Sequence, residues 1–188
     1  MGKLQVLNLP NVITIIRIVL VPCFVALLLR YRETGDEAFR WWAIGAFAAA
    51  MVSDALDGLI ARLKAQKSVL GSFLDPLADK LLLNTAVITL SLQLGHLARL
   101  PSWFPVIVIS RDLIIVLGAL LIHMLMGKVT PMPSVTGKFT TLFQMLTVIW
   151  ILLLWPHYLI PLSLAVAFTF ISGIEYIFLG LQQLQAQR

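Results

Sequence analysis

Charged residues are scarce in this chain. Only 12% of its 188 residues are charged and 60% are hydrophobic, whereas a soluble domain has roughly 25% charged residues. An ordinary soluble domain is therefore excluded, and no nucleic-acid partner is expected. Cysteine is scarcer still: Cys23 is the only one, so no disulfide can form within the chain. Internal repeats and low-complexity tracts are also absent, and the length favours a single domain spanning residues 1–188.

Long apolar runs dominate what is present. Six of them are long enough to cross a bilayer, at about 20 residues each, and we expect helices because lipid offers no water to unpaired backbone groups. The predicted spans are Val12–Leu29, Trp41–Ala61, Val69–Leu94, Trp103–Met126, Phe139–Trp155 and Tyr158–Leu181. We expect a short surface helix in the first ten residues, and the longest connection over Arg30–Arg40. The sequence thus predicts an all-α integral membrane protein with six transmembrane helices.

Positive charge is unevenly distributed between the two sides of this arrangement. One side holds both termini and the connections 62–68 and 127–138. Its cations, with no acid among them, are Lys3, Arg62, Lys64, Lys67, Lys128, Lys138 and Arg188. The other side carries fewer cations and all the acids of the connections. The positive-inside rule places the first side in the cytoplasm. We therefore expect a multi-pass protein of the inner (cytoplasmic) membrane, with both termini in the cytoplasm.

Four aspartates lie near the cytoplasmic ends of two neighbouring spans. Asp54 and Asp57 are three residues apart in the second span, and Asp75 and Asp79 are four apart in the third. Each spacing places its pair on one helix face, and a short loop makes the two helices antiparallel neighbours. A carboxylate inside the bilayer costs about 2.5–3.5 kcal/mol, which hard divalent cations offset through their preference for oxygen ligands. The pattern predicts a site for two divalent cations.

Small residues and an arginine accompany these carboxylates. Gly58, Ala61 and Gly71 leave room for a ligand to approach the backbone, and Arg62 carries a planar donor group suited to phosphate. Together they indicate a metal-bound pyrophosphate or nucleotide. The alternative for Arg62 is an ordinary cation of a cytoplasmic loop.

The spacing of these residues resembles the motif of a known family. The pattern Asp-x2-Asp-Gly-x2-Ala-Arg-x8-Gly-x3-Asp-x3-Asp is similar to that of the CDP-alcohol phosphotransferase (CDP-alcohol phosphatidyltransferase) family. It is met by Asp54, Asp57, Gly58, Ala61, Arg62, Gly71, Asp75 and Asp79. The segments 8–17 and 137–145 also resemble the bacterial phosphatidylglycerophosphate synthases. The likeness implies six transmembrane helices, a homodimer and a site open to the cytoplasm.

The resemblance also implies a reaction. A phosphatidyl group would pass from CDP-diacylglycerol to an alcohol, with release of CMP. The four aspartates would bind two divalent ions, Mg²⁺ or Mn²⁺, and Asp79 would be the general base. The residues expected to hold the CDP moiety are Gly58, Ala61, Arg62 and Gly71, with Thr14 and Arg17 from the first helix.

The acceptor is indicated by charge inside the later spans. Arg111 lies deep in the fourth span and must face the bundle interior or a wet cavity, while Lys138 opens the fifth. Both are predicted to bind the phosphate of an acceptor such as sn-glycerol 3-phosphate. The alternative is that Arg111 and Asp112 form a structural pair that joins helices. Glu175, in the sixth span, is expected to pair with a neighbouring helix or to mark a dimer contact.

Other functions stay open at this point. The string Ile109-Ser110-Arg111-Asp112 is more similar to cardiolipin synthases of the CDP-alcohol type, whose acceptor is phosphatidylglycerol, because phosphatidylglycerophosphate synthases usually have Arg-Glu there. A divalent-cation transporter would use the same carboxylates, but this chain lacks repeats and its acids lie towards one side. A non-catalytic membrane scaffold would need no cluster of intramembrane acids.

Overall fold

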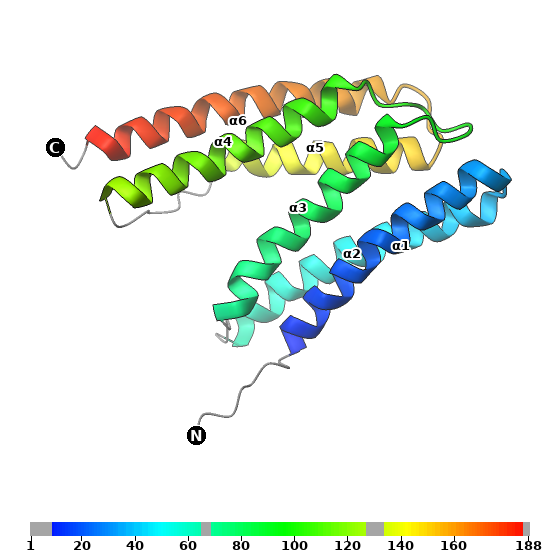
Figure 1. Cartoon of the computed structure of the whole chain (residues 1–188), viewed down its shortest axis with the longest axis horizontal. Coiled ribbons are helices and arrows are strands. Elements are labelled where there is room, and N and C mark those ends of the chain that lie inside the picture. Colours follow the sequence, from blue (N-terminus) through cyan, green and yellow to red (C-terminus); the bar gives the residue numbers. More distant parts are fainter. Residues whose placement is uncertain (1–8, 65–68, 127–133, 186–188) are drawn as a thin grey trace. The chain divides into compact units, whose positions relative to one another are not determined.

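The computed structural model describes the backbone of residues 9–64, 69–126 and 134–185 (Figure 1). Side chains are described in these ranges except at residues 9–14, 54–64, 69–79, 123, 125–126 and 184–185. Within the described residues there are six α-helices and no strand, which confirms the all-α prediction. They are α1 (Leu9–Thr34), α2 (Glu37–Lys64), α3 (Val69–Ser91), α4 (Trp103–Met126), α5 (Val135–Leu152) and α6 (Leu159–Gln185).

Membrane character is clearest in the last three helices. Among the described residues, three stretches are both long and apolar enough to cross a bilayer. They are Trp103–Ile122, Val135–Leu152 and Leu159–Gln183. Large apolar side chains such as Val116 and Met124 of α4 lie exposed on the protein surface. This is expected for a surface that faces lipid and not water.

The connection expected over Arg30–Arg40 is much shorter in the structure, so that prediction was wrong. The α1 helix continues to Thr34, where Gly35 takes a left-handed conformation (φ 70°) and its N–H donates to the Tyr31 carbonyl at 2.8 Å. Asp36 then caps α2, since its Oδ1 accepts from the Ala38 N–H at 2.9 Å. Charged residues extend both helices beyond the apolar spans because water and headgroups solvate their side chains.

Other helix ends also differ from the predicted spans. The α5 helix begins at Val135 instead of Phe139, since Ser134 caps it, and it ends at Leu152. The α3 helix ends at Ser91, before the predicted limit of Leu94. Most of the segment expected to form a short surface helix, residues 1–8, lies outside the described residues, and residues 9 and 10 begin α1.

The chain forms two compact units, Met1–Leu97 and Ala98–Arg188. Whether both belong to one domain stays a prediction. In the first unit, α1 packs against α2 and α3, and α2 also contacts α3. Steps of three and four residues place the buried side chains on one face of each helix. On α1 and α2 they are Arg17, Phe24, Leu28, Tyr31, Arg40, Ala43, Phe47 and Ala50. The Phe24 and Phe47 rings meet with their centroids 5.5 Å apart.

In the second unit, α6 packs against both α4 and α5. Its buried face includes the small residues Ala165, Thr169 and Ser172, which allow helices to approach closely. Stacked rings of Phe139, Phe143 and Phe168 add to the α5–α6 contact, with centroids 5.1–6.4 Å apart. This unit contains the polar cluster described below.

The first turn of α5 lies beside the middle part of α4 and of α6. Gly137, in that turn, is near Arg111 of α4 and Ser172 of α6. Both of these residues precede the ends of their helices, at Met126 and Gln185, by about 20 Å at a rise of about 1.5 Å per residue. Figure 1 shows α5 starting part-way along α4 and α6. The amino terminus of α5 is therefore recessed relative to the ends of α4 and α6.

Candidate functional site

The four aspartates lie on two helices that pack together. Asp54 and Asp57 are in the last part of α2, and Asp75 and Asp79 in the first part of α3. Their side chains lie outside the described residues, so their convergence stays a prediction. The same holds for the other motif residues and for one residue of α1: Gly58, Ala61, Arg62, Gly71 and Thr14.

The donor set fits a divalent metal by its chemistry. Four carboxylates on two contacting helices offer only oxygen ligands, which hard divalent cations prefer. Among the side chains that the structure describes, no group of three or more His, Cys, Asp or Glu could hold a metal ion. That the motif aspartates hold a metal stays a prediction.

Arg17 is fully buried within the first unit. It lies on α1, which packs against the two helices that carry the aspartates. A buried guanidinium is stable only when acceptor groups compensate its charge. The predicted role of Arg17 towards the CDP moiety stays a prediction.

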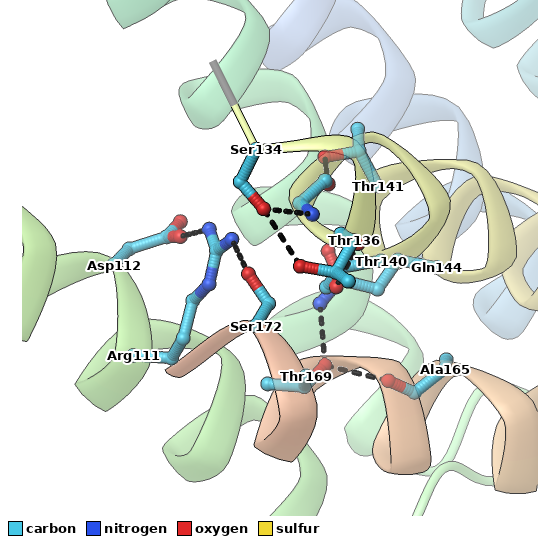
Figure 2. A network of polar contacts seen from close by, with 11 residues as sticks. Arg111, Asp112, Ser134, Thr136, Thr140, Thr141, Gln144, Ala165, Thr169 and Ser172 are labelled. Atoms are coloured by element: carbon cyan, nitrogen blue, oxygen red, sulfur yellow. Dashed lines mark hydrogen bonds and ion pairs between the residues drawn. The ribbon is translucent and has the colours of Figure 1, made fainter. Parts of the chain in front are cut away.

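Arg111 is the centre of a polar cluster in the second unit (Figure 2). Its side chain is nine-tenths buried. Nη1 donates to Oδ1 of Asp112 at 3.0 Å, and Nη2 donates to Oγ of Ser172 at 2.5 Å. The guanidinium also lies over the Tyr176 ring, 5.3 Å from its centroid. Its Nε is buried and makes no hydrogen bond within the described part of the chain.

Gly137 brings the first turn of α5 against this guanidinium. A Cβ built on Gly137 would lie 3.1 Å from Nη2 of Arg111 and 3.5 Å from the hydroxyl oxygen of Tyr176. It would also lie 3.6 Å from Oγ of Ser172. Only a residue without a side chain fits here without displacing its neighbours.

The remaining contacts of this turn run to α6. Ser134 Oγ accepts from the N–H of Gly137 at 3.2 Å and donates to Oε2 of Glu175 at 2.7 Å. The Thr136 hydroxyl donates to the same carboxylate oxygen. Lys138, also in the first turn, is exposed. The expectation that Glu175 pairs with a neighbouring helix is thus confirmed.

About two turns further along α5, a second polar contact joins α5 and α6. Nε2 of Gln144 donates to Oγ1 of Thr169 at 3.3 Å, and Thr169 donates to the carbonyl of Ala165 at 2.6 Å. Thr140 is buried and bonds to the backbone of its own helix. The segment 137–145 therefore supplies part of the first turn of α5 and part of its contact with α6.

Sequence reasoning singled out Arg111 and Lys138 but missed the residues that hold Arg111 in place. Ser172 and Tyr176 were not predicted, nor were Ser134 and Thr136 at the start of α5. Two signals were present in the sequence. Ser172, Glu175 and Tyr176 follow the i, i+3, i+4 spacing of one helix face, and Ser134 directly precedes a helical segment, where serine is a preferred cap.

Comparison with known proteins identifies the family. The family model for CDP-alcohol phosphatidyltransferases matches residues 7–172. The chain belongs to the CDP-alcohol phosphatidyltransferase family. It is therefore an enzyme of a lipid-synthesising class, not a divalent-cation transporter or a scaffold. Both units contribute to the matched region, including the aspartate motif and the residues from Arg111 to Ser172.

Several bacterial members of this family are similar over most of their length. One is the CDP-diacylglycerol–glycerol-3-phosphate 3-phosphatidyltransferase of Bacillus subtilis (strain 168). It is 34% identical over 185 residues, covering 90% of this chain and 93% of that protein. A probable phosphatidylglycerophosphate synthase of Mycobacterium tuberculosis (strain H37Rv) is 32% identical over 182 residues, covering 94% of this chain and 83% of that protein.

A relative with another name is matched over less of its length. The CMP-forming cardiolipin synthase of Streptomyces coelicolor is 34% identical over 139 residues. The alignment covers 73% of this chain and 61% of that protein. Both groups of CDP-alcohol phosphatidyltransferases that the sequence resembles are thus represented among its relatives.

Proposed function

We propose that this chain transfers a phosphatidyl group from CDP-diacylglycerol to sn-glycerol 3-phosphate, giving phosphatidylglycerophosphate and CMP. A free hydroxyl of glycerol 3-phosphate attacks the phosphorus that bears the diacylglycerol. A new phosphate ester bond forms while the pyrophosphate bond to CMP breaks, and the hydroxyl proton passes to a base. We assign the role of base to Asp79, because a carboxylate held next to the hydroxyl suffices when the developing charge is stabilised.

The substrate carrying the nucleotide belongs to the first unit in this proposal. Family membership implies a divalent metal, and two Mg²⁺ or Mn²⁺ ions bound by Asp54, Asp57, Asp75 and Asp79 would offset charge on the pyrophosphate and on CMP. The residues that we assign to the CDP moiety are Gly58, Ala61, Arg62, Gly71, Thr14 and Arg17.

The observation that carries the acceptor assignment is the position of Arg111. A nine-tenths buried guanidinium lies against the first turn of α5, where helix N–H groups and the helix dipole favour an anion. Lys138 adds a second cation in the same turn. A phosphate that binds here competes with Asp112 for Nη1 of Arg111. This chemistry suits the phosphate monoester of glycerol 3-phosphate.

Two observations support the cardiolipin synthase alternative: the Arg111-Asp112 string in the sequence and the Streptomyces relative. In that case the acceptor is phosphatidylglycerol. The alignments with the Bacillus and Mycobacterium relatives, named for glycerol 3-phosphate and for phosphatidylglycerophosphate, cover more of this chain and favour our proposal.

We further propose six membrane spans, with both termini and the active site in the cytoplasm, and a homodimer. The apolar stretches of α4, α5 and α6 and the excess of cations on one side support this placement. The dimer follows from the family resemblance.

One experiment tests the proposed function directly. Purified protein in detergent receives CDP-diacylglycerol and Mg²⁺, with glycerol 3-phosphate or phosphatidylglycerol offered separately. We expect CMP release with glycerol 3-phosphate, and phosphatidylglycerophosphate as the lipid product by mass spectrometry. Product from phosphatidylglycerol alone would overturn the acceptor assignment, and no CMP release with any alcohol would overturn the reaction.

A further inference from the structure

Glu175 is an acidic side chain within the apolar helix α6. Its Oε2 accepts hydrogen bonds from the hydroxyls of Ser134, at 2.7 Å, and Thr136. A carboxylate among apolar helices is costly unless its charge is compensated. Two hydroxyl donors and the positive end of the α5 dipole supply that compensation. The side chain is thus bound to the start of α5, not exposed to lipid as an isolated charge.

A single hydroxyl connects Glu175 to the part of α5 that faces Arg111. Oγ of Ser134 donates to the Glu175 carboxylate and accepts from the Gly137 N–H at 3.2 Å. A Cβ added at Gly137 would meet Nη2 of Arg111 at 3.1 Å, so this part of the turn lies close to the guanidinium. A displacement of Glu175 would therefore move the peptide beside Arg111.

One face of α6 holds both halves of the acceptor site. Ser172 and Tyr176 contact Arg111 of α4, while Glu175, between them, contacts the first turn of α5. The spacing of three and four residues places all three on the same face of the helix. Figure 2 shows Arg111 and Ser172 beside Ser134 and Thr136.

We propose that Glu175 is a positioning residue for the acceptor. It fixes the first turn of α5 against α6, and so determines where Gly137 and Lys138 lie relative to Arg111. This inference rests on the proposed acceptor site. A phosphate held between a guanidinium and a helix amino terminus requires both at a fixed separation, and a misplacement of about 1 Å can cost about 100-fold in rate.

If Glu175 acted directly through its charge, its removal would change acceptor binding in the opposite direction. A carboxylate near a bound phosphate repels it, so removal of the charge alone would strengthen acceptor binding. Removal of a positioning contact weakens acceptor binding instead. The direction of the change in acceptor KM therefore separates the two roles.

The test compares Glu175→Ala and Glu175→Gln in the full-length protein in detergent. The control is Glu33→Ala, which removes an exposed carboxylate paired with Arg30 at 3.4 Å on α1. We expect the KM for glycerol 3-phosphate to rise about tenfold in Glu175→Ala and about threefold in Glu175→Gln, because glutamine keeps an acceptor oxygen for one hydroxyl. The KM for CDP-diacylglycerol should stay within about twofold. A lower acceptor KM in either variant would overturn the proposal.

A double variant tests whether Glu175 affects acceptor binding through the first turn of α5. If Glu175 acts by holding the first turn, Thr136→Val should add little to the effect of Glu175→Ala. Independent, additive increases in KM would show that Glu175 acts in another way.

Hydrogen exchange supplies a measurement that does not depend on activity. In Glu175→Ala, amides of the first turn of α5, including Gly137, should exchange faster than in the wild type and in Glu33→Ala. Unchanged exchange would refute the positioning role even if the enzyme used a different acceptor. Conversely, if the wild type used phosphatidylglycerol instead of glycerol 3-phosphate, faster exchange and a higher KM for phosphatidylglycerol would support the positioning role while the proposed acceptor failed.

Discussion

Nη2 of Arg111 donates to the hydroxyl of Ser172 at 2.5 Å, across 61 residues of sequence. This contact joins α4 to α6 and fixes a guanidinium beside the recessed start of α5. Arg111 therefore links two helices, and its role towards an acceptor phosphate stays a proposal.

Gly137→Ala should weaken acceptor binding. The added methyl group would meet Nη2 of Arg111 at 3.1 Å, so the guanidinium or the turn must shift. We expect the KM for glycerol 3-phosphate to rise about tenfold, which corresponds to about 1.4 kcal/mol. The matched control is Gly118→Ala on α4, where a new Cβ meets nothing within 4 Å. Equal effects of the two changes would contradict the proposed role of this turn.

Arg111→Ala should raise the KM for glycerol 3-phosphate about 10- to 100-fold, as expected for the loss of hydrogen bonds from a charged group. Arg111→Lys should be intermediate, because an ammonium keeps the charge but not the planar set of donors. Arg99→Ala, in the connection before α4, is the control. Loss of folding in Arg111→Ala with an unchanged acceptor KM in Arg111→Lys would instead support a structural pair.

Asp79→Asn should reduce CMP release at least about 100-fold, since general base catalysis contributes about 10²–10⁴-fold. The asparagine keeps the size of the side chain, so the variant should still elute as a folded protein in size-exclusion chromatography. Wild-type turnover in this variant would exclude Asp79 as the base.

Chelation of divalent cations should abolish CMP release, because four clustered carboxylates without a cation repel one another and the phosphates of the substrate. Addition of excess Mg²⁺ or Mn²⁺ should restore turnover. Full activity after extensive dialysis against a chelator would argue against a metal-dependent site at the aspartate motif.

The environment of Tyr31 predicts that the stability of the fold depends on pH. This residue lies at the end of the first unit opposite the aspartates. Burial of this side chain, reinforced by the carboxylate of Glu37, raises the pKa of the phenol above its ordinary value of 10.0. The neutral phenol is thus favoured in the folded state. Its contribution to stability is fully present below the unfolded pKa and is lost as pH rises through the raised folded pKa.

Thermal unfolding in detergent at about pH 9 and about pH 11 measures this effect. The wild type should lose more Tm over this range than Tyr31→Phe, which has no phenol to ionise. Tyr158→Phe, which removes a half-buried hydroxyl in the second unit, is the control. An identical loss of Tm in the wild type and in Tyr31→Phe would contradict the prediction.

Helix existence was predictable, whereas several helix ends were not. Hydropathy located α4 correctly at both ends, because its apolar run coincides with the helix. Hydropathy placed the start of α2 four residues late, at Trp41 instead of Glu37. The first residues of this helix include charged side chains, and a search for apolar runs leaves such residues out even when they are helical. The signals for the true ends were local: Gly35 stops α1 and Asp36 starts α2.

The sequence alone determined the composition, the helical class and the chemical motif, because each depends on residue type and local spacing. Polarity along the chain sets which segments are apolar, and intervals of three and four residues set which side chains share a helix face. Only the tertiary structure decided that Ser172 contacts Arg111 and that Ser134 and Thr136 contact Glu175. Those partners lie 61 and about 40 residues away, and no local periodicity specifies which helix packs on which or at what register.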